Sequence, residues 1–298
     1  MTTATAAAVT RSARALDPRL SGARYTRGPG RWIVLALLLA LLAVFFFPFV
    51  LAIANAIKTP ADYASHGPLG VPHSFSLRAL ADFWTNVDFT RKLTNSILLS
   101  GLVAIFGVFL SLLNAYAIGI GKVRGGRPIL VLLLLSIMIP QEALVYPIYF
   151  MSKAAGLFDS LASCIIVFSV LQSAFGTYLL ASVLSTFPRE IIEAARVDGA
   201  NSWQILWLVI VPILRPTLAV LATFFFIWTW NEFLLPLVLL ISNDTQTVTV
   251  AMGVLHGQYV SDPTAIAAAA LLGMMPTVLF FLVFQRTLTR GVIVGAVK

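Results

Sequence analysis

Charged side chains are scarce in this sequence. Only 11% of its 298 residues are Asp, Glu, Lys or Arg, whereas a soluble protein contains about 25%. Hydrophobic residues make up 59%, which is more than a soluble domain of this length can cover, because large contiguous apolar surfaces associate. The composition therefore excludes a water-soluble enzyme and a disordered protein, and it indicates an integral membrane protein.

Cysteine is nearly absent, and so is any phosphate-binding loop. Cys164 has no second cysteine with which to form a disulfide, so a disulfide-rich secreted domain is excluded. The sequence contains no G-x-x-x-x-G-K-[ST]. The string GIGKV at 119–123 has the wrong spacing and lacks the hydroxyl that binds magnesium. We therefore expect the chain not to bind ATP itself, and we expect no cofactor, metal ion or catalytic residue of its own.

Long hydrophobic runs are abundant. A helix needs about 20 mostly apolar residues to cross a bilayer, and six runs meet this requirement. They span residues 32–56, 93–121, 128–151, 161–186, 217–241 and 265–284. The predicted fold is an all-α integral membrane protein with six transmembrane helices.

The positive charges indicate the orientation of these helices. With both termini in the cytoplasm, 15 of the 20 Lys and Arg residues lie in cytoplasmic segments and 5 in outer ones, as the positive-inside rule requires. The net charge of +8 thus reports orientation, and we expect no nucleic-acid partner. Residues 1–30 are expected to form a mobile cytoplasmic tail, residues 31–290 the transmembrane domain, and residues 291–298 a second cytoplasmic tail.

The outer connections carry weaker signals. In residues 57–92, Ser76 precedes apolar residues three or four positions apart. This spacing favours either a short surface helix with Trp84 at the membrane interface or an irregular loop. Residues 242–264 are polar and contain Gly253, Gly257 and Pro263, which favours an ordered turn.

The inner connection, residues 185–216, is too long for a plain link and is expected to have structure of its own. Ser185 or Thr186 is predicted to cap a helix whose first turn holds Pro188 and Glu190. This helix lies on the cytoplasmic face in the predicted orientation.

A glycine turn is predicted to follow that helix. Gly199 supplies the left-handed residue that ends it, and Asn201 or Ser202 caps a second short helix that runs toward Pro212. The connection is therefore a predicted cytoplasmic helix-turn-helix. Its small alanines favour either close approach by another protein or packing on the chain's own bundle, and the residues alone leave both open.

A spaced motif occupies the same connection. Glu193-Ala194-Ala195 is followed after three residues by Gly199, and after nine more by Val-Ile-Val-Pro at 209–212. This pattern resembles the EAA loop of permease subunits of bacterial ATP-binding-cassette importers, which reads EAA, three residues, Gly, nine residues and I-x-L-P. Two valines here replace the isoleucine and the leucine and keep the apolar character.

Three further strings resemble the smaller, six-span permease of maltose-type carbohydrate importers. They are WNEFL at 230–234 with Pro236, IPQEA at 139–143 with Pro147, and GAVK at 295–298. The resemblance covers nearly the whole chain after about residue 30.

The resemblance implies a transmembrane permease subunit of an importer for a sugar or sugar-like solute, in the plasma membrane of a prokaryotic cell. It implies as partners a second permease subunit, two ATPase subunits that bind ATP and Mg, an extracytoplasmic sugar-binding protein and the lipid bilayer. The EAA helix would dock on an ATPase subunit and couple its closure to alternating access. Docking falls here on Glu190, Glu193, Ala194, Ala195, Asp198, Gly199 and Ala200. Residues 291–298 would also reach the ATPase subunits, and contact with the binding protein would fall on Gly253, His256, Gly257, Gln258 and Tyr259.

Two acids interrupt the hydrophobic runs. Glu142 follows Gln141 and Glu232 follows Asn231, and both pairs lie at similar depth when counted from the start of their runs. Ionisable groups are costly inside a bilayer and usually face a hydrated path or a protein interior. These four residues either line the outer part of a sugar path or bond structurally to the backbone or to the second permease.

Two other functions remain as alternatives. In a self-sufficient secondary transporter, Glu142 and Glu232 would carry protons, and uptake would survive loss of the inner connection. A membrane enzyme is disfavoured because His66, His73 and His256 fall in outer connections without metal-ligand spacing or a nucleophile paired with a base.

Overall fold

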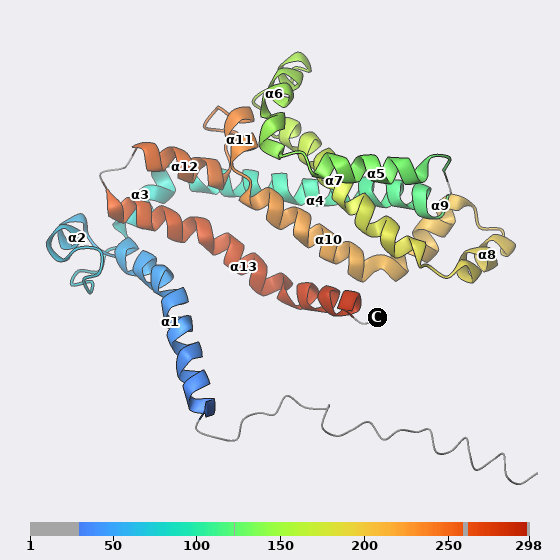
Figure 1. The fold of residues 1–298 in the computed structure, drawn as a ribbon. Helices are drawn as coiled ribbons and strands as arrows, with labels where there is room; N and C mark the ends of the chain where they lie inside the picture. The colour runs from blue at the N-terminus through green and yellow to red at the C-terminus, as the bar shows by residue number, and fades with distance from the viewer. Residues whose placement is uncertain (1–29, 122, 259–261, 297–298) are drawn as a thin grey trace, which may run out of the picture. The chain divides into compact units, whose positions relative to one another are not determined.

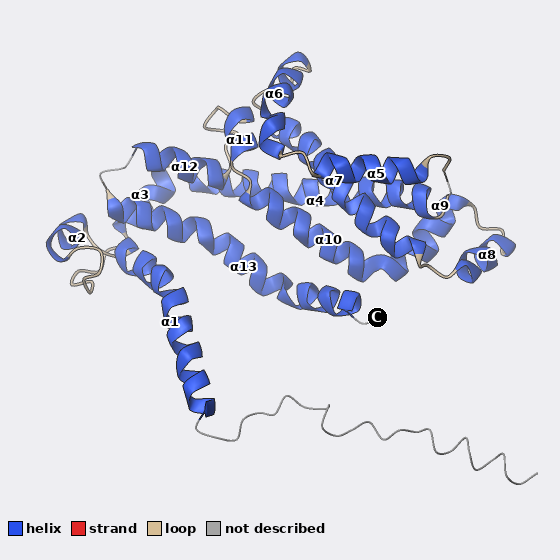
Figure 2. Cartoon of the chain, viewed as in Figure 1, coloured by secondary structure: helices blue, strands red, loops and turns tan. Residues whose placement is uncertain are grey.

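The computed structural model describes residues 30–121, 123–258 and 262–296 (Figure 1), with the backbone alone at 255–258 and 286–296. Every regular element within these ranges is a helix (Figure 2), which confirms the predicted all-α class. The predicted N-terminal tail lies outside the described residues except for Gly30, where the first helix begins.

The chain divides into two compact units, residues 1–51 and 52–298. The described part of the first unit belongs to α1 (Gly30–Ala56), which is 27 residues long and apolar on every face. A helix of this length extends about 40 Å, enough to cross a bilayer, and apolar residues all round are typical of a membrane span.

Three helices form the centre of the second unit: α4 (Phe89–Gly119), α7 (Leu161–Ser185) and α10 (Val211–Asn231). α4 runs along both of the others (Figure 1). Glycines permit this close approach, because a Cβ atom on Gly107 or on Gly176 would lie 2.9 Å from the ring of Phe225. Small residues at helix crossings bring backbones together in the same way in other membrane bundles.

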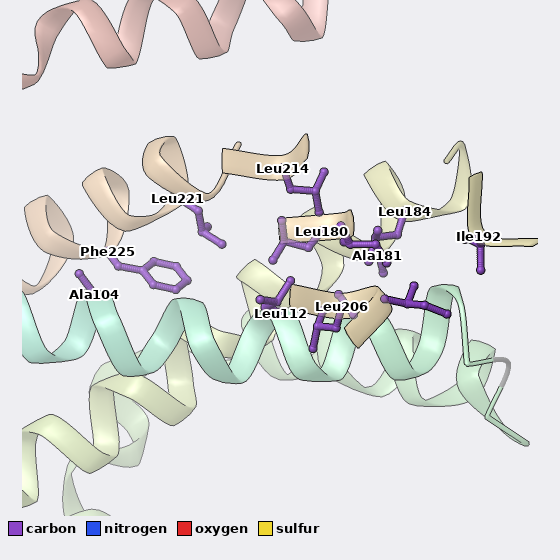
Figure 3. Close-up of a cluster of buried hydrophobic side chains, with 13 residues drawn as sticks. Ala104, Leu112, Leu180, Ala181, Leu184, Ile192, Leu206, Leu214, Leu221 and Phe225 are labelled. Atoms are coloured by element: carbon purple, nitrogen blue, oxygen red, sulfur yellow. The ribbon is translucent and has the colours of Figure 1, made fainter. Parts of the chain in front are cut away.

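A buried apolar cluster joins the central helices to the 185–216 connection (Figure 3). Its members are Ala104, Leu112, Ala115, Leu180, Ala181, Leu184, Ile192, Ile205, Leu206, Ile210, Leu214, Leu221 and Phe225. The connection is therefore packed directly on the central helices.

Further helices surround this centre. The longer ones are α5 (Gly126–Ile137), beside α4 and α7, and α13 (Pro263–Ala296), along α10. The shorter ones are α2 (Pro60–His66), α3 (Arg78–Asn86), α6 (Val145–Ala154), α8 (Arg189–Val197), α9 (Ser202–Gln204), α11 (Leu234–Leu239) and α12 (Val248–Gln258), with a 3-10 turn at Gln141–Leu144 and a π-helical segment at Ile205–Ile210. α13 continues through Ala296, so the predicted C-terminal tail is helical over 291–296.

Five described helices are long and apolar enough to cross a membrane, and the third predicted span is a broken one. Gly126–Ile137 and Gln141–Ala154 meet at an angle of 93°, so a straight helix over 128–151 is wrong. Pro140 lies at the break. Its ring removes a backbone donor and disfavours helical geometry at the preceding residue.

The fifth span is displaced from its predicted position at 217–241. The continuous helix runs over Ser202–Asn231, because the π-helical segment carries it through Pro212 instead of ending there. It stops at Glu232, whose backbone is extended with φ −70° and ψ 133°. Pro236 explains the stop, since its ring would clash with the carbonyl of Glu232 in a continued helix.

The connections at 57–92 and 242–264 contain more helix than the sequence indicates. α3 is the surface helix predicted after Ser76. α2 was not predicted, because a proline lies at its first position and further prolines follow it. Pro60 is the first residue of α2, where its missing N–H costs nothing. The polar turn predicted at 242–264 is wrong in part, because α12 fills its middle.

Candidate functional site

The 185–216 connection begins with the amphipathic helix α8. Neither Ser185 nor Thr186 caps it, because their hydroxyls donate back to the carbonyls of Ser182 and Val183 in α7. The residue at the N-cap position is Pro188, which makes no side-chain capping bond. The predicted cap is therefore wrong, although the helix itself is where the sequence placed it.

A glycine turn ends α8, as predicted. Gly199 has φ +84° and donates its N–H to the carbonyl of Arg196 at 3.0 Å, and Ala200 donates to Ala195 at 2.9 Å. Asn201, one of the two predicted caps, then forms a reciprocal capping box with Gln204, both bonds measuring 2.9 Å. The second helix does not end near Pro212 but continues into the membrane span.

α8 presents two different faces. Ile192 is buried in the core cluster, and Ala195 packs partly against it. The other face carries Ile191, Ala194 and Val197 at intervals of three, all exposed, with Val197 88% exposed. The predicted docking residues Glu190, Glu193, Asp198 and Gly199 are exposed as well, and Ala200 is half-buried. The helix therefore rests on its own bundle and keeps an apolar strip with charged neighbours free.

A hydrogen bond joins the C-terminal end of α4 to the first residue of α9. Tyr116 donates a hydrogen bond of 2.9 Å from Oη to the carbonyl of Ser202. The next residues of the chain, Ile205, Leu206 and Ile210, are buried against α4, α7 and α10. The connection is thus fixed at both its ends to membrane helices.

A polar hollow of 300 Å³ lies between the broken third span and the end of α10. Its walls are Gln141, Gln172, Ile227, Trp228, Asn231 and Glu232. The structure thus brings together three of the four residues predicted to share a path. Glu142 does not line the hollow and is exposed, because the 3-10 turn after Pro140 directs neighbouring residues to different sides.

Gln172 is the polar residue that sequence reasoning missed. Its Nε2 donates to Thr229 Oγ1 at 2.8 Å, but its buried Oε1 accepts no hydrogen bond from the part of the chain that the structure describes. A search for amides as well as acids within the apolar runs would have found it. An unpaired buried acceptor costs about 1–3 kcal/mol, so the hydrogen bonding of Gln172 is incomplete within the part of the chain that the structure describes.

The end of α10 is linked to α12. Thr249 donates from Oγ1 to the backbone carbonyl of Glu232 at 2.8 Å, and the ring of Phe233 occupies the space that a side chain at Gly253 would need. Of the residues predicted to touch a binding protein, only Gly253 is described in full. The side chains of His256 and Gln258 and the whole of Tyr259 lie outside the described residues, and Gly257 is described by its backbone alone.

The fold brings two of the three histidines close to a carboxylate, which their positions in the sequence did not indicate. Asp62, His66 and His73 place one ligand atom each within 4.8 Å of one another. Asp62 and His66 are four residues apart on α2 and so share a helix face, a relationship hidden because α2 itself was not predicted. His256 is not part of this group.

Apolar spans, a span broken at a proline and an amphipathic connection packed on the bundle define a multi-pass membrane protein. The chain belongs to the family described as binding-protein-dependent transport system inner membrane component, whose pattern matches residues 107–294.

The similarity of this chain to individual known proteins supports the same family. The chain is 28% identical to the melibiose/raffinose/stachyose import permease protein MelC of Bacillus subtilis, over 89% of this chain and 96% of that protein. It is 30% identical to the lactose transport system permease protein LacG of Rhizobium radiobacter, over 74% and 79% respectively. Its fold is similar to the crystal structure of a bacterial ABC transporter involved in the import of the acidic polysaccharide alginate, with a TM-score of 0.71, 22% identity and coverage of 88% of this chain and 98% of that one.

The chain is therefore a multi-pass permease subunit of an ATP-binding-cassette importer in the plasma membrane, and it is a translocation subunit and not an enzyme. As a member of a binding-protein-dependent system it works with other subunits. The comparisons give no support to the self-sufficient proton-coupled transporter.

Proposed function

We propose that this chain helps to carry a sugar or a sugar-like solute across the membrane, with both termini in the cytoplasm. The names of the relatives, which import melibiose, raffinose, stachyose and lactose, support a carbohydrate. The placement of Lys and Arg supports the orientation.

The observation that carries the proposal is the polar hollow itself, where Gln141, Gln172, Asn231 and Glu232 come together from three segments of the chain. Amide side chains offer a sugar hydroxyl both donors and acceptors. Asn231 and Glu232 lie in the same hollow, and amides and carboxylates bind hydroxyls through several hydrogen bonds. Trp228, 44% exposed, offers an apolar face on which a sugar ring packs. Gln141, Gln172, Asn231 and Glu232 therefore form the proposed path, and Glu142 is not part of it.

Uptake by the assembled importer tests the path. Gln172→Leu and Glu232→Gln are expected to lower the rate of sugar uptake at least tenfold while the subunits still assemble. Glu142→Gln is the matched control, since it makes the same chemical change outside the hollow, and it should leave uptake near the wild-type rate. Normal uptake by both hollow variants would contradict the proposed path.

ATP is proposed to act on this chain through α8. The exposed strip of Ile191, Ala194 and Val197 supports docking in a cleft of an ATPase subunit, where Glu193 and Asp198 would fix the orientation through charge-assisted hydrogen bonds. Two such subunits bind ATP and Mg, and the chain itself binds neither. Closure of the ATPase pair would push α8 against the core cluster and move the central helices.

Gly199 allows a matched test of this coupling. Its φ of +84° is strained for a β-branched residue but accessible to asparagine, and nothing lies within 4 Å of a Cβ atom there. Gly199→Val should therefore uncouple ATP hydrolysis from uptake or release the ATPase subunits, whereas Gly199→Asn should keep both. Val197→Asp, which charges the exposed strip, should release them too. Co-purification of the ATPase subunits at wild-type yield with Val197→Asp would remove the docking assignment.

The remaining partners complete the proposal. A second permease subunit would face this chain across the path. An extracytoplasmic sugar-binding protein would contact the region of Gly253, His256, Gly257, Gln258 and Tyr259. ATP dependence separates this function from a proton-coupled one: uptake should persist when the proton gradient is collapsed with ATP supplied, and should stop when ATP is withdrawn.

A further inference from the structure

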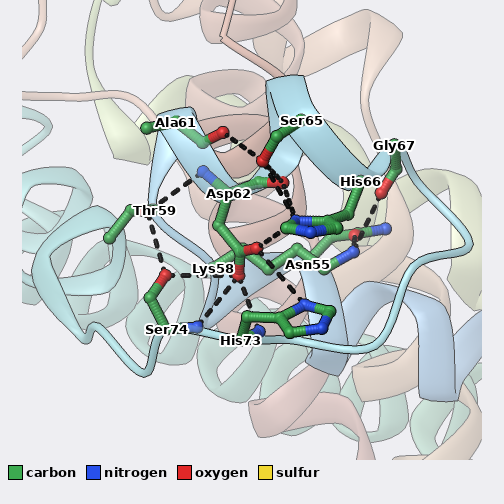
Figure 4. A network of polar contacts seen from close by, with 10 residues as sticks. All are labelled: Asn55, Lys58, Thr59, Ala61, Asp62, Ser65, His66, Gly67, His73 and Ser74. Atoms are coloured by element: carbon green, nitrogen blue, oxygen red, sulfur yellow. Dashed lines mark hydrogen bonds and ion pairs between the residues drawn. The ribbon is translucent and has the colours of Figure 1, made fainter.

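A compact group of two imidazoles and one carboxylate lies in the connection between α1 and α3 (Figure 4). Asp62 and His66 are on α2, and His73 belongs to the segment that returns beside it. The rings of His66 and His73 stack with their centroids 4.0 Å apart and an interplanar angle of 20°. Nothing in the transport proposal uses these side chains.

The carboxylate of Asp62 is held rigidly. Its Oδ2 accepts hydrogen bonds from the N–H groups of His73 at 2.9 Å and Ser74 at 3.1 Å and from the hydroxyl of Ser74 at 3.2 Å. The side chain of Asp62 is only 4% exposed, so these bonds hold a buried carboxylate in one orientation.

The other carboxylate oxygen faces the two histidines. Oδ1 of Asp62 lies 2.8 Å from Nδ1 of His66 and 3.7 Å from Nδ1 of His73. Two ligands bound tetrahedrally to an ion at about 2.0–2.1 Å lie about 3.3 Å apart. The two measured separations lie on either side of this value, and all three ligand atoms lie within 4.8 Å of one another. The stacked rings of His66 and His73 must turn apart before both Nδ1 lone pairs point at one ion.

The surroundings also suit an ion. The side chains of His66 and His73 are 42% and 62% exposed, which leaves room for entry and for a water ligand. Lys58, the neighbouring cation, is occupied elsewhere, since its Nζ donates to Asn55 Oδ1 at 2.9 Å and to the carbonyl of Gly67 at 3.0 Å.

We propose that Asp62, His66 and His73 bind one divalent transition-metal ion, of which Zn²⁺ suits the ligand set best, with water in the fourth position. Two imidazoles and a carboxylate are borderline ligands that favour zinc over calcium or magnesium. On binding, the hydrogen bond between His66 Nδ1 and Asp62 Oδ1 breaks, Nδ1 gives its lone pair to the ion, and the single proton of the neutral ring is carried by Nε2 instead. The ion joins α2 to the returning segment and stiffens this connection.

Zinc titration of the full-length chain tests this site. The protein is purified in detergent with an affinity tag that contains no histidine, and Zn²⁺ is titrated by calorimetry. The expected result is one ion per chain and an affinity that falls at least tenfold in His66→Ala and in His73→Ala. Co²⁺ in place of Zn²⁺ should give the visible absorption of a tetrahedral site.

The chain provides its own control. It has three histidines, and His256→Ala should bind Zn²⁺ as the wild type does. His73→Ala keeps the backbone bond to Asp62 and removes a mostly exposed ring, so its fold should persist; equal melting temperatures without metal would verify this. Wild-type affinity in both His66→Ala and His73→Ala, or no binding by the wild type at millimolar Zn²⁺, would show that the group is only a hydrogen-bonded clasp.

Discussion

Thr245 donates a hydrogen bond of 2.7 Å from Oγ1 to Oδ1 of Asp159, a residue 86 positions earlier. The same carboxylate accepts the N–H groups of Ile241 and Ser242 at 3.0 Å each, and the hydroxyl of Ser242 donates to it as well. In return, the N–H of Asp159 donates to the carbonyl of Leu239 at 3.0 Å. One acidic residue thus joins the connection after α6 to the connection after α11.

Replacement of Asp159 should loosen this junction. In Asp159→Ala the N–H groups lose a charged acceptor, and since the site is partly exposed to water we expect the free energy of unfolding to fall by about 1–2 kcal/mol. Asp159→Asn keeps one acceptor oxygen, so its free energy of unfolding should fall by less than that of Asp159→Ala. Thermal unfolding in detergent, with limited proteolysis of residues 240–247, measures both variants. Identical melting and cleavage for Asp159→Ala and the wild type would show that the junction is held by other contacts.

Acid should loosen the connections that contain Asp62 and Asp159. Burial tends to raise the pKa of Asp62 and of Asp159, but the hydrogen bonds that each accepts lower it, to about 2 for Asp62. A carboxyl group whose folded pKa lies below its unfolded value of 3.8 stabilises the fold fully above about pH 4, and this stabilisation is lost as pH falls through the folded pKa.

The difference between wild type and Asp62→Asn reports this effect. Hydrogen exchange of residues 59–74 should be slower in the wild type at about pH 6, and the difference should shrink toward about pH 2. A difference that stays constant with pH would mean that Asp62 contributes through its shape and not through its charge.

The sequence predicted the elements whose causes are local. The turn at Gly199 and the cap at Asn201 were predicted because each depends on a single residue type with a known backbone or side-chain preference. The end of the helix after Asn201, expected near Pro212, and the start of the fifth span at 217 were wrong, because the helix continues through a π-helical segment that no residue pattern in the sequence indicates. Local signals therefore placed the connection correctly but not its continuation into the membrane.

The site residues that were not predicted depend on how distant segments pack together. The pairing of Glu142 with Glu232 rested on equal depth in two straight helices, and the bend at Pro140 removed one of those helices. Gln172 and the group at Asp62 depend on contacts between segments distant in the sequence. Single-sequence periodicity contains no information about which face of one span meets another.

Two glycines of α4 give a matched pair for the packing of the bundle. A Cβ atom at Gly107 would lie 2.9 Å from the ring of Phe225, whereas one at Gly101 would meet nothing within 4 Å. Alanine is favoured over glycine inside a helix by about 1 kcal/mol. Gly101→Ala should therefore keep or raise the melting temperature, and Gly107→Ala should lower it because the ring of Phe225 must shift. Equal melting temperatures for the two variants would mean that the crossing of α4 and α10 adapts freely.

Lys92 and Arg91, two neighbouring cations at the start of α4, make one buried and one exposed interaction. Lys92 is fully buried, and its Nζ donates to the carbonyl of Asn243 and, at 2.8 Å, to Asn243 Oδ1. Arg91 is half-exposed and pairs with Asp244 at 2.5 Å. Lys92→Met leaves the carbonyl of Asn243 without this donor and should cost about 1–3 kcal/mol of unfolding free energy, whereas Arg91→Met removes a surface ion pair worth about 0–1 kcal/mol.

Salt distinguishes the two interactions further. Screening weakens an exposed pair and scarcely affects a buried one, so the small effect of Arg91→Met should vanish at high ionic strength while that of Lys92→Met persists. Thermal unfolding of both variants at low and high salt makes the comparison. If Lys92→Met melts with the wild type, the segment at 243–247 is held instead by Asn95, whose Nδ2 donates to the carbonyls of Asp244 at 2.8 Å and Gln246 at 3.0 Å. The double variant Lys92→Met with Asn95→Ala would then show the loss that the single variant does not.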